Sequence, residues 1–256
     1  MNPTITTRFN LFLLSIALII PTTIIAAEIP WASSPEEVGM STDRLEQINT
    51  VMQRHIEAGD IQGAVTVIAR RGKIVHFEAH GLMDVERERP MLEDSVFIMM
   101  SSSKPVLGVA AMIMVEEGLI RPEDPVSLYL PEFADMQVAV LREPVDENVS
   151  PLRVDRNNVP EHRLVPAKRE ITIHDLLTHT SGLLSGGLGS MVAERAPFPL
   201  PAGSTLESEI ARYASSPLDF QPGERWSYSP LVGLDVVARI VEVASGQPYD
   251  EFIKQR

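Results

Sequence analysis

The chain has 256 residues, of which 44% are hydrophobic and 22% are charged, and its formal net charge is −13 at pH 7. This composition is that of a folded globular protein with one large or two smaller domains. The acidic balance argues against a nucleic acid as partner, because binding to phosphates depends on basic side chains. The chain contains no cysteine, which excludes a disulfide framework and a thiol nucleophile.

The first 27 residues differ in composition from the rest. Arg8 precedes an apolar run from Leu11 to Ile20, and the small pair Ala26-Ala27 follows. This order is typical of a secretory signal peptide. We therefore predict a signal peptide over residues 1–27 and a mature chain over residues 28–256, located in the periplasm or secreted. The alternative is an uncleaved segment, which would be the only membrane attachment that we expect.

The region after the leader predicts a helix followed by a β-hairpin. Apolar residues recur at helical spacing between Ser41 and Ala58. Two β-prone runs, Ala64 to Ala69 and Ile74 to Ala79, flank the short polar stretch Arg70-Arg71-Gly72-Lys73. Such a stretch between two β-prone runs favours a hairpin turn.

The middle of the chain predicts a buried helix and then a long loop. The run from Val106 to Val115 is apolar nearly all round, so we expect its helix to be buried, and Gly118 to end it. The stretch from Arg142 to Arg169 is rich in proline and charge, which indicates an extended excursion. A glycine-rich stretch over residues 185–190 lacks the pattern of a phosphate-binding loop, and we interpret it as a flexible connection.

Three further helices are expected toward the end of the chain. Ile173 to Leu177 has helical character, and a capping box over Ser204-Thr205-Leu206-Glu207 opens a helix that continues through Tyr213. The apolar run from Val232 to Ala244 predicts another helix, ended by Ser245-Gly246. Two strands followed mostly by helices indicate α+β or α/β packing.

The stretch Ser101-Ser102-Ser103-Lys104-Pro105 directly precedes the apolar run that begins at Val106. A serine and a lysine three residues apart at a helix start share one face, so Lys104 could accept the proton of the Ser101 hydroxyl. A serine hydroxyl needs such a base to become a nucleophile, and a helix N-terminus favours the negative charge that develops. The alternative is that the serines only cap a helix with Pro105 in its first turn.

The histidines do not predict a metal centre. The sequence lacks both cysteine and the His-x-x-x-His pattern, and His174 and His179 are five positions apart, which is off one helical face. We therefore expect no zinc.

Several short motifs follow one another in a characteristic order between residues 36 and 256. They are Gly63-Ala64-Val65, Gly81-Leu82-Met83-Asp84, Ser101-Ser102-Ser103-Lys104-Pro105, Asp124-Pro125-Val126, Tyr129-Leu130-Pro131, Leu176-Leu177-Thr178-His179-Thr180-Ser181-Gly182-Leu183, Pro222-Gly223-Glu224 and Trp226-Ser227-Tyr228-Ser229. Together they resemble the serine β-lactamase and penicillin-binding-protein-like superfamily, in its branch of class C β-lactamases, esterases and D-stereospecific peptidases. The resemblance implies an α+β fold (an α/β sandwich) of the β-lactamase/transpeptidase type, with an antiparallel sheet and a helical subdomain.

The resemblance also assigns roles to three residues. It implies that Ser101 forms an acyl-enzyme, that Lys104 helps to deprotonate it, and that Tyr228 shuttles protons. No cofactor is implied, and the substrate would be a small molecule or peptide: an ester, a β-lactam or a D-amino-acid peptide. Without the resemblance, Tyr228 would be interpreted as a core aromatic residue with a bonded hydroxyl. Trp226 either walls the acyl pocket or packs as an ordinary tryptophan.

His179 supports two interpretations. A Ser-His hydrolase site would need Ser181 or Ser185 within hydrogen-bond reach of its ring. In the resembled family the Thr-His-Thr-Ser-Gly turn has a structural character, so we expect His179 to be a buried, hydrogen-bonded turn residue.

Two departures from the family pattern bear on function. Pro230 stands where the family has the asparagine of a Tyr-x-Asn motif, which argues against efficient β-lactam hydrolysis. The third motif, Lys-Thr-Gly or His-x-Gly, is not found before Arg256, so we expect a domain over residues 28–256 that lacks the C-terminal strands. A missing oxyanion donor costs about 100- to 1000-fold in rate. The rival hypotheses are a D,D-peptidase and a catalytically inactive fragment that serves as a binding module.

Overall fold

The computed structural model describes residues 29–142, 159–193 and 200–256. The predicted signal peptide and the first part of the proline-rich excursion lie outside these ranges. The chain divides into two compact units, one that ends at Phe97 and one that runs from Ile98 to Arg256. None of the helices within these three ranges has the length and apolar character needed to cross a membrane.

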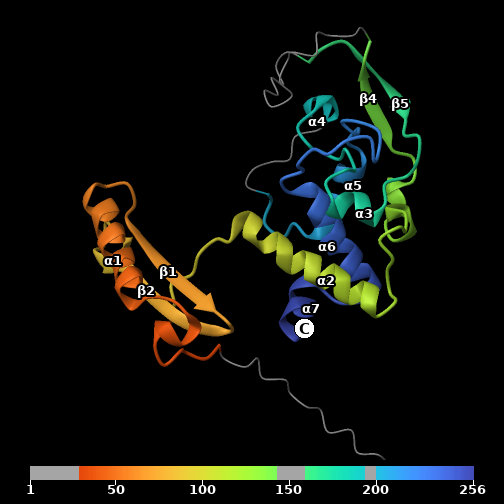
Figure 1. Cartoon of the computed structure of the whole chain (residues 1–256). Helices are drawn as coiled ribbons and strands as arrows, with labels where there is room; N and C mark the ends of the chain where they lie inside the picture. The colour runs from red at the N-terminus through yellow and green to blue at the C-terminus, as the bar shows by residue number, and fades with distance from the viewer. Residues whose placement is uncertain (1–28, 143–158, 194–199) are drawn as a thin grey trace, which may run out of the picture. The chain divides into compact units, whose positions relative to one another are not determined.

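The first unit is a helix packed against a β-hairpin (Figure 1). Its elements are η1 (Pro35–Val38), α1 (Thr42–Glu57), β1 (Gly63–Arg70), β2 (Lys73–Asp84) and β3 (Arg89–Pro90). The strands form an antiparallel sheet in the order β1-β2-β3. Helix α1 begins after Ser41, whose hydroxyl accepts the backbone N–H of Arg44. The predicted helix and hairpin are confirmed.

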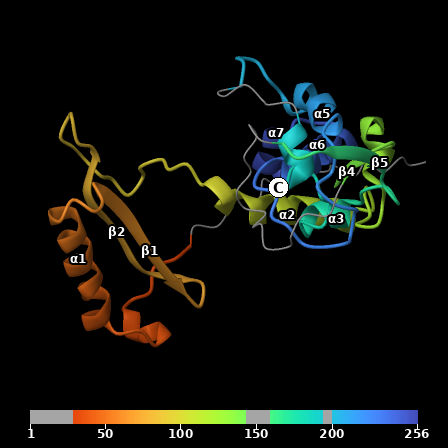
Figure 2. The same cartoon turned by 90° about the horizontal axis from the view of Figure 1, so that it is seen from above.

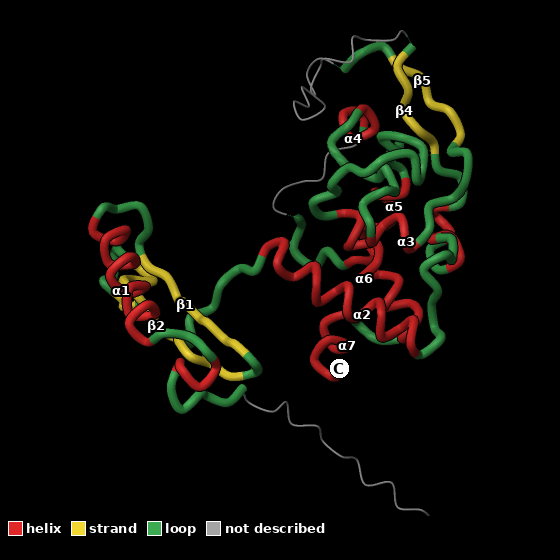
Figure 3. Tube along the Cα trace, viewed as in Figure 1, coloured by secondary structure: helices red, strands yellow, loops and turns green. Residues whose placement is uncertain are grey.

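The second unit consists mainly of helices and loops, with one pair of strands at its edge (Figure 3). Its first elements are η2 (Met100–Ser103), α2 (Lys104–Glu116), η3 (Val126–Leu128), η4 (Pro131–Phe133), β4 (Gln137–Leu141) and β5 (His162–Pro166). These are followed by α3 (Ile173–Leu177), α4 (Leu188–Val192), α5 (Leu206–Ala214), α6 (Val232–Ser245) and α7 (Tyr249–Gln255). Strands β4 and β5 pair antiparallel, from Gln137 opposite Pro166 to Leu141 opposite His162.

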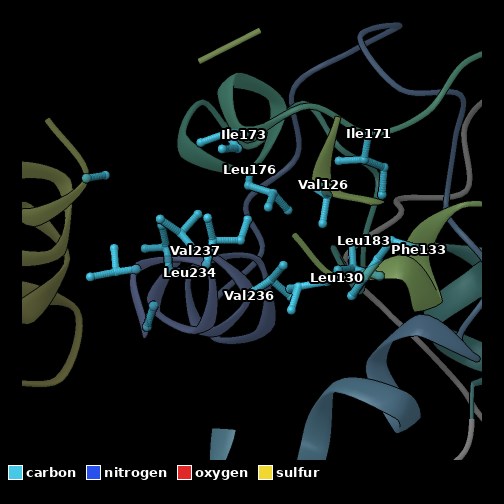
Figure 4. Packing of buried hydrophobic residues seen from close by; sticks show 14 of the residues in the cluster. Val126, Leu130, Phe133, Ile171, Ile173, Leu176, Leu183, Leu234, Val236 and Val237 are labelled. Atoms are coloured by element: carbon cyan, nitrogen blue, oxygen red, sulfur yellow. The ribbon is translucent and has the colours of Figure 1, made fainter. Parts of the chain in front are cut away.

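Helix α6 is the centre of this unit, and both Figure 1 and Figure 2 show it among the other helices. It packs against α2, α3, α5 and α7. Leu234, Val236 and Val237 of α6 are buried in one cluster with Leu176 of α3 and with Leu183, which lies next to Leu130 and Phe133 (Figure 4). Burial of each such side chain contributes about 1.5–3 kcal/mol. The core of the second unit is therefore built around the helix that directly follows the Tyr228 segment.

Helix α2 is buried on only one side. Leu107, Ala110, Ala111 and Met114 are buried. By contrast, Val106, Val109 and Met112 are exposed, and 61% of the Val109 surface is accessible. The prediction that this helix is buried all round is therefore wrong for the face that carries Val106, Val109 and Met112. Its end is as predicted, since Gly118 adopts a left-handed φ of 72° just after the last turn.

Two other predictions need correction. The excursion between Arg142 and Arg169 contains strand β5, which pairs antiparallel with β4 along its whole length. Helix α5 is capped by Thr205, whose hydroxyl accepts the N–H of Ser208 while the Ser208 hydroxyl accepts the N–H of Thr205. The capping box is thus displaced by one residue from the predicted Ser204–Glu207 pair. The helices over α3 and α6 are confirmed.

Candidate active site

Ser101 lies in a tight turn at the start of α2. Its neighbour Met100 has a left-handed φ of 48°, which is costly for a residue with a side chain. The Ser103 hydroxyl donates to the carbonyl of Met100 at 2.7 Å, and the N–H of Ser102 donates to the carbonyl of Met99 at 3.0 Å. This turn presents Ser101 at the surface, with its side chain accessible to solvent.

Three functional groups converge at this turn. The Lys104 ammonium donates to Ser101 Oγ at 3.0 Å. On the other side, Ser101 Oγ and Tyr228 Oη are 2.8 Å apart, although the two residues are 127 positions apart in sequence. The Lys104 Nζ also lies 5.4 Å from the centroid of the Tyr228 ring. The structure therefore brings together the three residues singled out from the sequence.

The contacts of Tyr228 favour its ionised form. Hydrogen bonds with Ser101 and then with Lys104 lower the pKa of the Tyr228 phenol below its ordinary value of 10. A nearby positive charge stabilises a phenolate, and a hydrogen bond to the charged oxygen does the same. Because an ammonium group has no free lone pair, a charged Lys104 can only donate to Ser101 Oγ, and the Ser101 proton is left to point toward Tyr228 Oη.

Tyr228 is fixed by the residues on either side of it. The Ser229 hydroxyl accepts the N–H of Gly233 at 3.2 Å, which satisfies a free donor in the first turn of α6. The Ser227 hydroxyl donates to the carbonyl of Ser185 at 2.9 Å. The backbone around Tyr228 is thus tied to α6 on one side and to the glycine-rich stretch on the other.

The glycine-rich stretch is held by Asp219, which is buried. Its Oδ2 accepts the N–H and the hydroxyl of Ser185 at 2.6 and 2.9 Å and the hydroxyl of Ser190 at 2.8 Å. Its Oδ1 accepts the N–H of Ser190 at 2.6 Å. A Cβ on Gly189 would lie 2.3 Å from the carbonyl oxygen of Pro217, so no side chain fits there. The prediction of a flexible connection is wrong, because four hydrogen bonds to one carboxylate order this stretch and α4 begins within it.

The turn that contains His179 is held by a second buried carboxylate, Asp175. Arg169 binds it with two hydrogen bonds, of 2.5 and 2.9 Å, and the Thr180 hydroxyl donates to it at 3.1 Å. Burial opposes the charge on Asp175, but the Arg169 and Thr172 hydrogen bonds outweigh it and lower the pKa of Asp175 to about 2. Gly223 donates its N–H to the carbonyl of Thr180, which connects the Pro-Gly-Glu motif to the same turn.

His179 belongs to the Tyr228 side of the site and, within the described residues, makes no hydrogen bond to Ser181 or Ser185. Ser181 Oγ accepts the N–H of Leu183, and Ser185 Oγ donates to Asp219. The His179 ring instead meets the Tyr228 ring edge to face, with 4.8 Å between the centroids. The contacts do not support a Ser-His pair within the described residues, and they agree with a hydrogen-bonded turn residue. His179 is half-buried, so the expectation that it is buried needs correction.

Trp226 and Pro230 lie at the surface beside Tyr228. Trp226 is 66% exposed and meets His179 only edge to face, at 6.4 Å between centroids, so ordinary core packing does not account for it. Pro230 is exposed and brings no amide group to the site. In the part of the chain that the structure describes, no three acidic or histidine side chains are grouped so as to hold a metal ion.

Sequence reasoning missed two features of the site, the Asp219 carboxylate and the contact of His179 with the segment around Tyr228. The signal for Asp219 was weak: the four residues Leu218-Asp219-Phe220-Gln221 place one charge among neighbours that are mostly apolar. A lone charge in such a stretch indicates a buried and paired carboxylate.

The chain is similar to several known proteins. Esterase EstB of Burkholderia gladioli is 35% identical over 210 residues, which are 79% of this chain and 46% of that protein. Lovastatin esterase of Penicillium rubens is 32% identical over 216 residues, 82% of this chain and 49% of that protein. The chain therefore spans about half the length of these relatives.

Among solved structures, EstCE1, described as a hydrolase with promiscuous acyltransferase activity, superposes with a TM-score of 0.60 at 28% identity. The match covers 83% of this chain and 50% of EstCE1. The octameric penicillin-binding protein homologue of Pyrococcus abyssi gives a TM-score of 0.59 at 25% identity, over 84% of this chain and 42% of that one. The fold expected from the sequence is confirmed. The family profile described as Beta-lactamase matches residues 48–256, and the chain belongs to the β-lactamase family.

Proposed function

We propose that this chain carries the acylation site of a serine hydrolase, with Ser101 as nucleophile and with Lys104 and Tyr228 as its proton-transfer partners. The observation that carries the proposal is the position of Ser101 Oγ, which has Lys104 Nζ at 3.0 Å and Tyr228 Oη at 2.8 Å. Hydrogen-bond reach between nucleophile and base is the geometric requirement for an activated serine.

The proposed reaction begins with the phenolate of Tyr228. It accepts the proton of Ser101 as Oγ attacks the carbonyl carbon of the substrate, and the carbonyl electron pair moves onto its oxygen. Collapse of this intermediate breaks the bond to the leaving group, which takes the proton from Tyr228 and departs. Water then attacks the acyl carbon and loses a proton to Tyr228. Collapse of this second intermediate breaks the bond between the acyl carbon and Ser101 Oγ, which takes the proton back from Tyr228, so that the acid is released and both residues are restored.

Lys104 contributes charge throughout this cycle. Its ammonium hydrogen bond to Ser101 Oγ stabilises the alkoxide, and its position near the Tyr228 ring stabilises the phenolate. Charge-assisted hydrogen bonds of this kind are about twice as strong as neutral ones. Lys104 therefore assists the proton transfer between Ser101 and Tyr228 through its hydrogen bond and its charge.

We propose a carboxylic ester as the substrate. EstB and lovastatin esterase are esterases by name, and Pro230 offers no amide to orient a lactam or peptide carbonyl. Hydrolysis of p-nitrophenyl esters of increasing acyl length would test this choice against a chromogenic β-lactam and a D-alanyl-D-alanine peptide. Turnover of the lactam or the peptide without ester turnover would contradict it.

The acylation site itself is tested with a fluorophosphonate, which phosphonylates activated serines, followed by intact-mass spectrometry and peptide mapping. We expect one adduct on Ser101, none in Ser101→Ala, and a rate lower by about 100- to 10,000-fold in Lys104→Ala. Ser102→Ala is the matched control, because Ser102 lies in the same turn and should label at nearly the wild-type rate. A folded wild-type chain without an adduct would contradict the proposal and favour a binding module instead.

A further inference from the structure

His179 makes three contacts with the Tyr228 segment, residues 227–229. The carbonyl of His179 accepts the N–H of Ser227 at 3.0 Å, and its ring Nδ1 accepts the N–H of Ser229 at 3.3 Å. These two bonds hold the residues directly before and after Tyr228. The third contact is the edge-to-face packing of the two rings, at 4.8 Å between centroids.

The backbone of His179 is itself held in an uncommon conformation. Its φ is 59°, in the left-handed region that non-glycine residues seldom adopt. The N–H of His179 donates to the carbonyl of Leu176, and the N–H of Thr180 donates to the carbonyl of Asp175. Because a left-handed residue persists only where its surroundings fix it, the turn aims both the carbonyl and the ring of His179 at the Tyr228 segment.

The bond from Ser229 also fixes the protonation state of the ring. A backbone N–H can only donate, so Nδ1 must carry a lone pair, and the ring proton of neutral His179 lies on Nε2. Two titratable groups face this ring, the Tyr228 phenol and the Lys104 ammonium. Burial first, and then the charge of Lys104, lower the pKa of His179, which keeps the ring neutral and Nδ1 free to accept.

We propose that neutral His179 is a positioning residue that fixes the Tyr228 phenol against Ser101. This inference rests on the proposed role of Tyr228 as the proton-transfer partner. His179 does not touch the Ser101 hydroxyl and takes no part in proton transfer. Its function is to hold Tyr228 Oη at 2.8 Å from Ser101 Oγ, the distance at which the phenol is stabilised as a base.

Two substitutions separate this role from simple packing. In His179→Asn, the amide Oδ1 occupies the branch position of Nδ1 and can accept the Ser229 N–H, and asparagine tolerates a left-handed φ. In His179→Leu, bulk is kept but the acceptor is lost. His174→Asn is the matched control, because His174 is an exposed histidine on α3.

The first readout is the ionisation of Tyr228, followed by ultraviolet difference titration. The chain has four tyrosines, and the other three titrate later. Burial is the main cause that raises the pKa of Tyr129 and of Tyr213 to about 12, and it also raises the pKa of Tyr249. The first phenol to ionise is therefore Tyr228, and Tyr228→Phe identifies its signal.

The second readout is the rate of fluorophosphonate labelling at Ser101. We expect His179→Leu to lose the lowered pKa of Tyr228 and to label about 10- to 100-fold more slowly, because small misplacements of reacting groups have effects of this size. His179→Asn should keep the lowered pKa and label within about threefold of wild type. His174→Asn should match wild type in both readouts.

The two readouts distinguish failure of this inference from failure of the proposed function. Suppose that the wild-type chain is not labelled, but that the pKa of Tyr228 rises in His179→Leu and not in His179→Asn. This result would contradict the hydrolase proposal and leave the positioning role intact. A His179→Leu variant with wild-type pKa and labelling would overturn the positioning role. If His179→Leu does not fold, a folded His179→Asn that has lost both the pKa shift and the labelling would overturn it as well.

Discussion

Replacement of Asp219 is expected to destabilise the second unit and also to lower the rate at which Ser101 is labelled. Each carboxylate oxygen accepts one backbone N–H, Oδ1 that of the buried Ser190 and Oδ2 that of the half-buried Ser185. In Asp219→Ala both N–H groups lose their acceptor, and each unsatisfied buried donor costs about 1–3 kcal/mol. The two serine hydroxyls can rotate toward other acceptors, so we assign them no cost. The expected loss is about 2–6 kcal/mol, a large share of the 5–15 kcal/mol that stabilises an ordinary domain.

Asp219→Asn refines this test. An amide has one accepting oxygen and one donating nitrogen, so it satisfies one of the two N–H groups and faces the other with an N–H of its own. We expect Asp219→Asn to lose about half as much stability as Asp219→Ala, at least about 1 kcal/mol. Asp135→Ala, an exposed aspartate of the same unit, is the matched control and should change stability by less than about 0.5 kcal/mol.

The assay is urea unfolding followed by circular dichroism, together with Ser101 labelling on the folded variants. Because the Ser185 carbonyl accepts the Ser227 hydroxyl, loosening of the glycine-rich stretch should also slow labelling. An Asp219→Ala variant that unfolds within about 1 kcal/mol of wild type would refute the argument that the carboxylate satisfies these donors.

Three further outcomes are expected. The labelling rate of Ser101 should rise with pH and reach half its maximum below pH 10. The reason is that the proposed base is the Tyr228 phenolate, and hydrogen bonds, chiefly that with Ser101, lower the pKa of Tyr228. Tyr228→Phe should remove this rise. Burial opposes ionisation of Asp175, yet its hydrogen bonds lower its pKa from 3.8 to about 2, so it stabilises the fold above about pH 4 and this contribution disappears as the pH falls through 2. Acid unfolding of Asp175→Asn, compared with wild type, should lack that dependence. Gly189→Ala should lower stability by about 1–3 kcal/mol in urea unfolding, because its Cβ would lie 2.3 Å from a carbonyl oxygen, and wild-type stability would contradict the close approach.

The sequence was sufficient where the structure depends on neighbours along the chain. Ser101 and Lys104 are three residues apart, and one helical turn places their side chains together whatever the rest of the chain does. The α1 helix and the β1–β2 hairpin follow in the same way from apolar spacing and a short polar turn. Tyr228 could not be placed by such reasoning, because it meets Ser101 from 127 positions away, and only the family resemblance selected it.

The features that sequence reasoning missed depend on distant partners. Glycines in residues 185–190 indicate a backbone free to adopt many conformations, but they do not indicate that Asp219 selects one of them from 29 and 34 positions away. The cap of α5 shows a smaller ambiguity. Both Ser204 and Thr205 have a polar residue three positions later, and local sequence does not decide between them.

The packing of α2 against α6 has a consequence for how this site would change under selection. Lys104 is the first residue of α2. The Ser229 hydroxyl, next to Tyr228, accepts the N–H of Gly233 in the first turn of α6. The distance between the two proton-transfer groups is therefore set by how closely two helices pack, several residues away from any substrate. A change of one methyl group at the buried Ala111 of α2 or the buried Val237 of α6 is expected to move the phenol relative to the ammonium. Substitutions that change the acylation rate are thus expected in the apolar interior of the second unit as well as among the residues around Ser101.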